Sequence, residues 1–359
     1  MNLLTVIFRK ISVLGVWALL FSVFLSGETV FGQTKESLQY GDLLYSQKQY
    51  VLAARQYSTY LQSNAKASGA ESVWYKLGEC YLKNKQYADS QTTFKYIVDT
   101  YKKGPIVGAA AYSLAVLNYN KKNAGDAERY FGIAARESKD PMEQVKAKYY
   151  LAKTLQLAQK FDPALKLYQE VIDTKIDGKD NPLKDRSQLE LARAKFDKGD
   201  IKGALDLFES LSRTAVSEDV KQEALARAGL LAAQAGEVDR SEKLLEQVLK
   251  SSETNPWREY AQVGIIYNAF ARQDYDKVVG IYSLGNYKVD EKSRAKVLLI
   301  IGHSYRMKGE LPHAERLYKL IEAKFPDTPE GSEAGFRVLQ VLHQQNKGSL
   351  PVAVRAFTD

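Results

Sequence analysis

The sequence predicts an all-α fold: a right-handed α-solenoid, or superhelix, of about eight helix-turn-helix repeats with a C-terminal capping helix. The first observation behind this prediction is a ladder of mostly small residues that recurs about every 37 positions in a chain of 359 residues. Self-similarity at such a period is typical of stacked repeat arrays, which bind partners along a surface and seldom carry out chemistry. The ladder consists of Gly41, Gly78, Ala115, Ala152, Ala192, Gly229, Ile266 and Gly302.

A second ladder lies twelve residues further along the chain in every repeat. Its members fall on the second helix of each expected pair, so small side chains face each other across the pair. We therefore expect the helix that carries Gly78 to approach its partner closely, with Ser90 at the same contact. The second ladder consists of Ala53, Ser90, Ala127, Ala164, Ala204, Ser241, Val278 and Ala314.

Short polar turns separate the two helices of each repeat. In the second repeat, apolar residues recur at helical spacing on both sides of the turn, as amphipathic helices require. A helix pair of this kind cannot bury its apolar face alone, so neighbouring pairs must stack. The turns are expected at Lys83–Gln86, Lys121–Asn123, Lys198–Asp200, Ala235–Glu237 and Lys308–Glu310.

The repeat resembles the tetratricopeptide repeat (TPR), whose pattern is W-x2-L-G-x2-Y followed by A-x3-F and a proline. The resemblance covers about residues 34–326, although each repeat here is some three residues longer than the 34 of that family. The best-formed repeat reads Trp74-x-x-Leu77-Gly78-x-x-Tyr81 with Tyr87, Ser90 and Phe94, and the eighth reads Ile301-Gly302-x-x-Tyr305 with Ala314, Tyr318 and Pro326.

The resemblance implies a concave groove lined by the first helix of each repeat. Tyrosine suits such a groove because it offers flat area with a polar tip. The alternative is that these tyrosines pack between helices. The partner-binding residues that the resemblance implies are Tyr75, Tyr112, Tyr119, Tyr149, Arg193, Phe196, Tyr260 and Tyr267. A wider set maps to the same face: Tyr45, Phe270, Lys83, Lys146, Lys153, Arg186, Lys296, His303 and Arg306.

The two ends of the chain differ from the repeats. Arg9 and Lys10 precede an apolar run at residues 11–25, which is the layout of a secretory signal peptide and is short for a membrane span. We expect residues 1–32 to be a signal peptide cleaved after Gly32, which leaves residues 33–345 as the solenoid. An uncleaved membrane anchor is the alternative. A helix at about 329–345 would be the cap, and residues 346–359 would form a flexible tail or the stump of a longer chain.

The composition argues against several function classes. The net charge of +8 is spread over 51 basic and 43 acidic residues without a long basic run, so we expect no nucleic-acid partner. A mildly basic protein can still prefer acidic partners. The one cysteine, Cys80, is expected to be a small buried residue.

No catalytic or metal-binding motif is present in the sequence. The three histidines form no recognisable constellation, and the segment 173–181 lacks the ligand spacing of a calcium loop, so a polar loop between the fourth and fifth repeats explains it better. We therefore predict no enzymatic activity, no catalytic residue, no metal and no cofactor.

The predicted function is a non-enzymatic, protein-binding scaffold or adaptor of the bacterial periplasm or cell envelope. Segments 94–101 and 320–326 are similar to repeats of periplasmic envelope proteins, which include outer-membrane assembly lipoproteins and coordinators of the Tol–Pal system. One alternative is a polysaccharide-handling repeat protein, whose aromatic groove would stack on the sugar rings of a glycan or of peptidoglycan. Another is a helper domain of a cell-wall enzyme. Membrane contact is expected only through an uncleaved signal.

Overall fold

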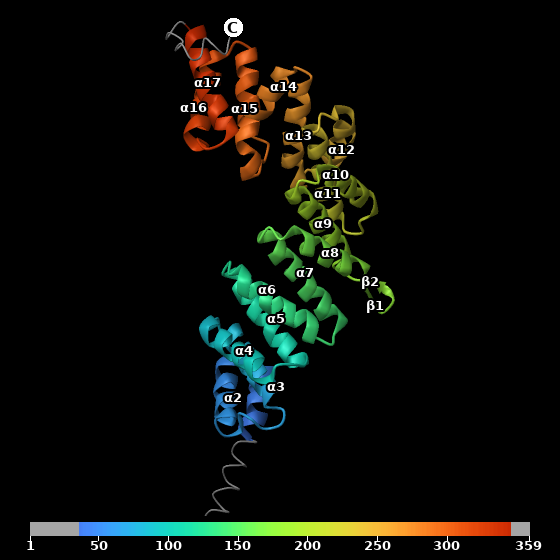
Figure 1. Cartoon of the computed structure of the whole chain (residues 1–359), viewed down its shortest axis with the longest axis vertical. Helices are drawn as coiled ribbons and strands as arrows, with labels where there is room; N and C mark the ends of the chain where they lie inside the picture. The colour runs from blue at the N-terminus through green and yellow to red at the C-terminus, as the bar shows by residue number, and fades with distance from the viewer. Residues whose placement is uncertain (1–35, 346–359) are drawn as a thin grey trace, which may run out of the picture. The chain divides into compact units, whose positions relative to one another are not determined.

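The computed structural model of the chain describes residues 36–345, and it is built almost entirely of helices (Figure 1). The expected signal peptide and the expected tail lie outside these residues. The described residues divide into two compact units, one formed by residues 36–167 with 174–181 and the other by residues 168–173 with 182–345. The last residues of α8 (Phe161–Asp173) therefore belong to the second unit.

Unit 1 is a stack of consecutive helices. Its helices are residues 36–46, α2 (Tyr50–Asn64), α3 (Ala70–Lys83), α4 (Tyr87–Tyr101), α5 (Pro105–Asn120), α6 (Ala124–Glu137), α7 (Pro141–Leu157) and the first part of α8. It ends in a short antiparallel hairpin, in which β1 (Lys175–Ile176) pairs with β2 (Lys179–Asp180). The hairpin occupies the polar loop at which the repeat lengthens to 40 residues, where Asn181 donates from Nδ2 to the carbonyl of Thr174 at 2.8 Å.

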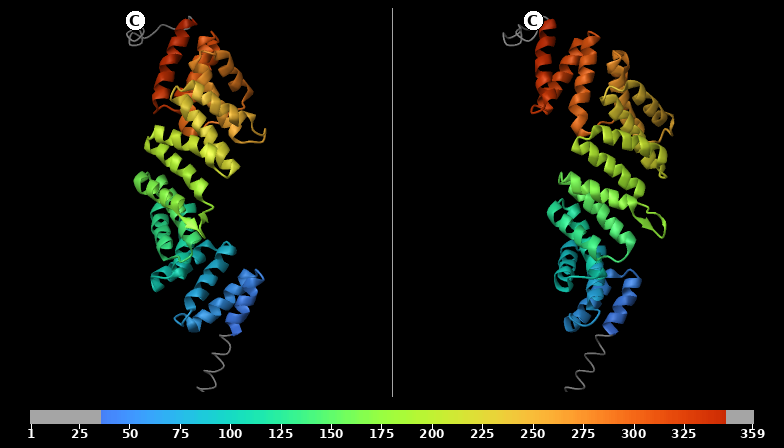
Figure 2. Two further views of the ribbon diagram at one scale, coloured as in Figure 1. Left: turned by 90° about the vertical axis from the view of Figure 1, so that its right-hand side faces the viewer. Right: turned by 45° about the vertical axis from the view of Figure 1, so that its right-hand side comes forward.

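Unit 2 continues the same alternation of first and second helices. Its helices are α9 (Lys184–Lys198), α10 (Ile201–Thr214), α11 (Glu218–Gln234), α12 (Val238–Lys250), α13 (Trp257–Ala271), α14 (Tyr275–Leu284), α15 (Glu291–Met307), α16 (Leu311–Lys324) and α17 (Pro329–Gln344). Within each unit, consecutive helices pack on one another, as the two views of Figure 2 show. The prediction of eight helix pairs and a capping helix is confirmed.

Both ladders of small residues lie in the core, as the sequence predicts. Every member of the second ladder is fully buried, with 0% of its surface exposed. Every member of the first ladder is buried as well. The serines of the second ladder also bond across the pair: Ser90 Oγ donates to the carbonyl of Gly78 at 3.0 Å, and Ser241 Oγ donates to that of Gly229 at 2.8 Å.

A third ladder explains why the residues of the first ladder must have small side chains. Sixteen residues after each position of the first ladder stands a large side chain of the second helix, and at the four glycines Gly41, Gly78, Gly229 and Gly302 it lies directly over the small position. A Cβ placed on Gly78 would lie 2.6 Å from Cε1 of Phe94, and one on Gly302 would lie 2.8 Å from Cε1 of Tyr318. The third ladder consists of Tyr57, Phe94, Phe131, Tyr168, Phe208, Leu245, Tyr282 and Tyr318, and all but Tyr282 are buried.

The seventh pair solves the same packing problem differently. Ile266 fills the small position and is fully buried, while Tyr282, which would occupy that space, is only half-buried. The glycine of this pair has moved to Gly264, where a Cβ would lie 2.6 Å from Cδ1 of Leu245 on α12. The close approach therefore occurs between α13 and the preceding helix instead of within the pair.

The turns inside the pairs share one backbone geometry. The residue seven positions after each small position has a positive φ in all eight pairs, and the following amide donates to the carbonyl five residues back, as in Gln86 to Tyr81 at 2.8 Å. This bond is the six-to-one contact of the Schellman motif that ends many helices. Glycine supplies the positive φ in three pairs, and lysine or glutamine does so in the others at a steric cost. The positions are Lys48, Lys85, Lys122, Gln159, Gly199, Gly236, Gln273 and Gly309.

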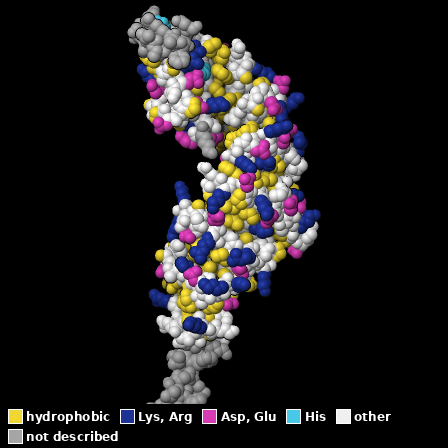
Figure 3. All heavy atoms as spheres, viewed as in Figure 1, with side chains coloured by type: hydrophobic (Ala, Val, Ile, Leu, Met, Phe, Trp, Pro, Cys, Tyr) yellow, Lys and Arg dark blue, Asp and Glu magenta, His cyan; other side chains and the backbone are white. Residues whose placement is uncertain are grey.

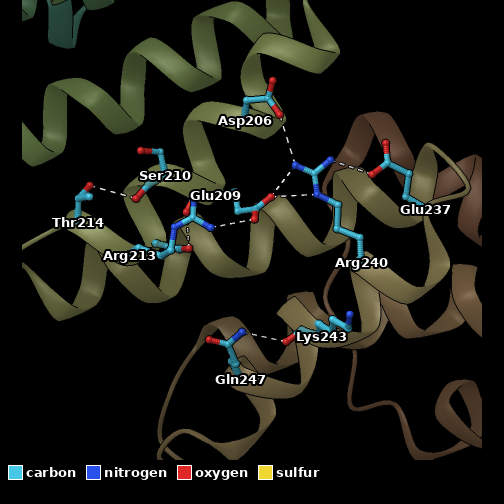
Figure 4. A network of polar contacts seen from close by, with 10 residues as sticks. Asp206, Glu209, Ser210, Arg213, Thr214, Glu237, Arg240, Lys243 and Gln247 are labelled. Atoms are coloured by element: carbon cyan, nitrogen blue, oxygen red, sulfur yellow. Dashed lines mark hydrogen bonds and ion pairs between the residues drawn. The ribbon is translucent and has the colours of Figure 1, made fainter.

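Ion pairs join successive helix pairs of unit 2 at the surface. Arg240 of α12 contacts Glu209 of α10 at 2.9 Å, Asp206 of α10 at 3.3 Å and Glu237 at 2.8 Å, as Figure 4 shows. These carboxylates raise the pKa of the Arg240 guanidinium. A single exposed ion pair contributes little to the free energy of folding. We therefore assign this network the role of aligning α12 with α10, and not that of a main source of stability. Arg272 makes the same kind of tie to α12.

Replacing Gly78 with leucine should lower the free energy of unfolding by about 1–3 kcal/mol, because the new side chain has no room beneath Phe94. Chemical denaturation of the chain followed by far-ultraviolet circular dichroism measures this change. Gly132→Leu on α6 is the matched control, since a Cβ there meets no atom within 4 Å. Equal stability of the two variants would contradict the close approach.

Candidate partner-binding surface

Four half-buried tyrosines lie together on the first helices of unit 1: Tyr75 on α3, Tyr112 and Tyr119 on α5, and Tyr150 on α7. They are named here the tyrosine surface. The ring of Tyr150 lies 6.2 Å from that of Tyr112 and 6.3 Å from that of Tyr119, in both cases edge to face. Aromatic pairs prefer this geometry, so the rings hold one another in place.

The third ladder supports the tyrosine surface from beneath. The ring centres of Tyr75 and Phe94 lie 5.6 Å apart, and those of Tyr112 and Phe131 lie 5.7 Å apart. Phe94 and Phe131 are fully buried. The same side chains that fill the space over the small positions therefore also orient the tyrosines.

A pocket opens between Tyr75 and Tyr112, with a cavity volume of about 130 Å³. The lining consists of two tyrosines, several small side chains and two charged residues of α7. An apolar cavity of about 150 Å³ holds a benzene molecule, so this pocket has room for about one side chain. The lining residues are Tyr75, Gly108, Ala109, Tyr112, Ala134, Ser138, Glu143 and Lys146.

The turn between α6 and α7 contributes Ser138 to the pocket lining and is itself held in place by hydrogen bonds. Ser138 is buried, and its Oγ donates to Glu143 at 2.8 Å. Its backbone carbonyl accepts from Gln144 Nε2 at 2.6 Å. Asp140 caps α7 by accepting from the amide of Met142 at 2.7 Å. Helix α5 packs closely on this turn, because a Cβ on Gly108 would lie 2.8 Å from the amide nitrogen of Ser138. The pocket is therefore preformed.

Lys146 is the cationic group of the pocket. It is exposed, and within residues 36–345 no hydrogen bond or ion pair holds its ammonium group. Glu143, the carboxylate nearest to it in the lining, accepts the Ser138 hydroxyl proton. The pocket lining therefore combines two tyrosines and several small residues with one ammonium group and one carboxylate.

Burial keeps the two pocket tyrosines protonated. It raises the pKa of Tyr75 to about 12, with Glu79 adding to the effect, and it raises the pKa of Tyr112 to about 12, with Tyr150 adding to the effect. Both hydroxyls therefore remain neutral hydrogen-bond donors at physiological pH.

The structure separates the tyrosines that the sequence places in one groove. Tyr75, Tyr112 and Tyr119 form the tyrosine surface, whereas Tyr149 is only 6% exposed and Tyr267 only 8% exposed. The side chains of Tyr149 and Tyr267 are thus almost entirely enclosed within the chain. Tyr150, which the sequence analysis missed, takes the place expected for Tyr149. The adjacent pair Tyr149-Tyr150 was the available signal, since neighbouring residues on a helix point about 100° apart.

In unit 2, Arg193 belongs to a buried charge network. It contacts Glu190 at 3.1 Å and also Glu223, and Arg227 donates to the same Glu223 at 2.7 Å. Both carboxylates are buried. The Arg193 guanidinium therefore links α9 to α11, and removing it would take one cation away from two buried carboxylates. Arg193 is thus held by the protein's own acids.

The other expected residues of unit 2 lie apart from this network or at its edge. Phe196 is 38% exposed. Tyr260 is half-buried, its ring lies 5.2 Å from Trp257, and the ammonium group of Lys288 lies 5.4 Å from its ring centre. Trp257 in turn lies under the guanidinium of Arg227 at 5.6 Å.

Several residues of the wider set are already engaged in contacts within the chain. Tyr45 donates to Glu79 at 2.7 Å. Lys296 lies 5.6 Å from the ring of Tyr267, and Lys153 lies 5.7 Å from that of Tyr149. His303 bonds Tyr318 and faces Glu333 of α17, and its burial lowers its pKa.

The two units differ in charge. The described part of unit 1 carries 21 lysine and arginine residues against 14 aspartate and glutamate residues, whereas unit 2 carries 25 against 27. On the face that Figure 3 shows, the charged side chains are scattered among hydrophobic and neutral ones without forming a single block. The positive excess of the described residues thus belongs to unit 1, which holds the pocket.

Two features are absent from residues 36–345. No group of three or more histidine, cysteine, aspartate or glutamate side chains within that range is arranged to hold a metal ion. None of the helices in the same range is long and apolar enough to cross a membrane. Cys80 is buried, and its burial raises the pKa of the thiol to about 12.

Comparison with known proteins agrees with this architecture. Two family models, both described as tetratricopeptide repeat, match residues 72–103 and 189–256. These segments cover most of the second repeat and of the pairs α9–α10 and α11–α12. The chain therefore contains tetratricopeptide repeats.

Solved structures show the likeness at the level of the fold. The apo form of RapI is similar with a TM-score of 0.54 at 12% identity, over 89% of this chain and 99% of that one. The Cut9 and Hcn1 hetero-tetramer of the APC/C is similar with a TM-score of 0.51 at 14% identity, over 85% of this chain and 55% of that one. No curated protein matches the chain by sequence.

The raised tyrosine pKa values predict a loss of stability at high pH. A tyrosine whose folded pKa lies above its unfolded value of 10.0 stabilises the fold below pH 10, and this stabilisation is lost as the pH rises toward 12. Phenolate absorbance titration should therefore show a late-titrating fraction above pH 10 that shrinks in Tyr112→Phe. An unchanged titration curve in this variant would contradict the burial of Tyr112.

Proposed function

We propose that this protein is a non-enzymatic scaffold that holds a segment of a partner protein on the tyrosine surface of unit 1. The observation that carries the proposal is the preformed pocket between Tyr75 and Tyr112. Tyrosines recur at the energetic centres of protein interfaces, because they bring a large rigid area at a low cost in conformational entropy. Here the rings are held by each other and by the core, so little further order is lost on binding.

We also propose that the protein works in the bacterial periplasm or cell envelope. The support for this location is the sequence of residues 1–32, with its basic pair and short apolar run, which is typical of a secretory signal peptide. A scaffold exported in this way would meet its partner outside the cytoplasm. Detection of the processed chain, beginning at Gln33, in a periplasmic fraction tests the location.

The sugar-binding alternative receives less support from the geometry. Stacking on a sugar ring requires an open aromatic face. Tyr150 lies nearly parallel to Phe131, with ring centres 5.7 Å apart and an angle of 14°. Tyr112 and Tyr119 meet that stack edge to face. At least one face of the Tyr150 ring is therefore covered by Phe131, which leaves less open aromatic face for a pyranose ring.

Truncating the tyrosine surface should abolish partner capture without unfolding the protein. The double variant Tyr75→Ala and Tyr112→Ala, made in the chain from Gln33 onward, is compared with the unchanged chain in cross-linked capture from envelope extract. Anchor truncation at an interface centre typically costs about 2 kcal/mol or more, which is roughly a thirtyfold loss of affinity. Quantitative mass spectrometry gives the amount of each protein captured by the double variant relative to the amount captured by the unchanged chain.

Tyr87→Ala is the matched control, because Tyr87 is 49% exposed and stands at the start of α4, outside the tyrosine surface. It should capture the same proteins as the unchanged chain. Circular dichroism must show full helicity for all variants. Equal capture by the double variant and the control would overturn the proposed function.

A further inference from the structure

We infer that α17 is the first helix of a ninth pair and that residues 350–357 of the same chain pack on it as the second helix. This segment lies outside the described residues, so the inference rests on its sequence and on the burial pattern of α17. It is independent of the proposed function, since it concerns the C-terminal end of unit 2.

The sequence after α17 repeats the start of the second helix of the eighth pair. Residues 347–357 read Lys-Gly-Ser-Leu-Pro-Val-Ala-Val-Arg-Ala-Phe, and residues 308–318 read Lys-Gly-Glu-Leu-Pro-His-Ala-Glu-Arg-Leu-Tyr. The two segments carry the same residue at six of the eleven positions, and both end on an aromatic side chain. Such self-similarity within one chain is the signature of a further repeat.

Each of these shared residues has a structural role in the eighth pair. Gly309 supplies the positive φ of the turn, and Leu311 and Pro312 begin α16. Ala314 and Tyr318 are the fully buried members of the second and third ladders. The later segment therefore contains a turn glycine, a helix start, a small residue and a large one at the same spacing. These residues are Gly348, Leu350, Pro351, Ala353 and Phe357.

Helix α17 has the burial pattern of a first helix without its partner. In α15, Gly302 and Tyr305 lie against side chains of α16, and both are buried. Leu339 and Leu342 stand at the same places in α17, counted back from the residue that caps each helix, and both are only half-buried. The side of α17 that a second helix would cover is thus apolar and partly open within residues 36–345.

The ninth pair would differ from most others in one respect. Leu339 fills the position that is small elsewhere, as Ile266 does in the seventh pair, where the opposing Tyr282 is only half-buried. From Leu339 to Phe357 the chain runs 18 residues, two more than the usual spacing of the first and third ladders. A turn that is longer by two residues lets the second helix lie farther from α17, as the larger Leu339 requires.

The consequence is that the chain itself closes this end of the array. The last unit of a repeat stack has no neighbour to cover its apolar side, and a polar outer face is needed there for solubility. A segment packed on Leu339 and Leu342 would provide this cover. It would also keep a second copy of the chain from stacking on the same side of α17.

The contact can be measured directly in the chain from Gln33 onward. The protein is deuterated except for leucine methyl groups and phenylalanine rings. Nuclear Overhauser effects should then connect the ring protons of Phe357 with the methyl groups of Leu339 or Leu342, because side chains that pack together have heavy atoms within about 4.5 Å.

Phe357→Ala should abolish these effects and shift the methyl resonances of Leu339 and Leu342. Thr358→Ala is the matched control, because Thr358 corresponds to Lys319, which is exposed on α16. This control should leave both the effects and the resonances unchanged. In a mixture of chains that carry only the leucine protons with chains that carry only the phenylalanine protons, the effects should be absent, since the contact lies within one chain.

Three results would overturn the inference. The first is the absence of any effect between Phe357 and the two leucines of α17. The second is an equal response of these leucines to Phe357→Ala and Thr358→Ala. The third is the persistence of the effects in the mixed sample, which would place Phe357 on a second copy of the chain.

Discussion

The structure depends on one steric pairing, repeated along the chain: a small residue on the first helix of a pair lies beneath a large residue of the second. Where the small residue is glycine, even one added methyl group would lie within 3.0 Å of the opposing side chain, as at Gly78 and Phe94. Interiors are close-packed, so this contact fixes the distance between the helices. The pairing also bears on the proposed binding surface, since Phe94 and Phe131 lie against the rings of Tyr75 and Tyr112. Stability and the proposed recognition therefore involve the same side chains.

The turns share a geometry of their own. All eight turns adopt a positive φ at the same position, and the seventh pair does so without the close approach between its two helices. Five of them do so with lysine or glutamine instead of glycine, which indicates that tertiary packing outweighs local preference. Surface ties such as Arg240 with Glu209 then align one pair with the next. The turns and the surface ion pairs thus add to an alignment of the helices that core packing has already set.

Much of the fold could be predicted from the sequence because it is periodic. Both ladders, the polar turns and the capping helix lie where their spacing in the sequence places them. This is so because a helix face that is buried in every repeat requires similar residues at the same spacing in every repeat. The site is harder, because it depends on the direction of single side chains. Tyr149 and Tyr150 are adjacent and identical, and only the packing of α7 decides that the former is buried and the latter half-exposed. Likewise, nothing in the sequence shows that Arg193 is held by Glu223, thirty residues away.

A double-mutant cycle across Gly78 and Phe94 tests the central claim most directly. The free energy of unfolding is measured for the unchanged chain, for Gly78→Leu, for Phe94→Ala and for the double variant. If the two side chains compete for one volume, the double variant should be less destabilised than the sum of the single changes, with an interaction energy of about 0.5–3 kcal/mol. Additive effects of the two changes would contradict the account, because they would mean that Gly78 is small for a reason unconnected with Phe94.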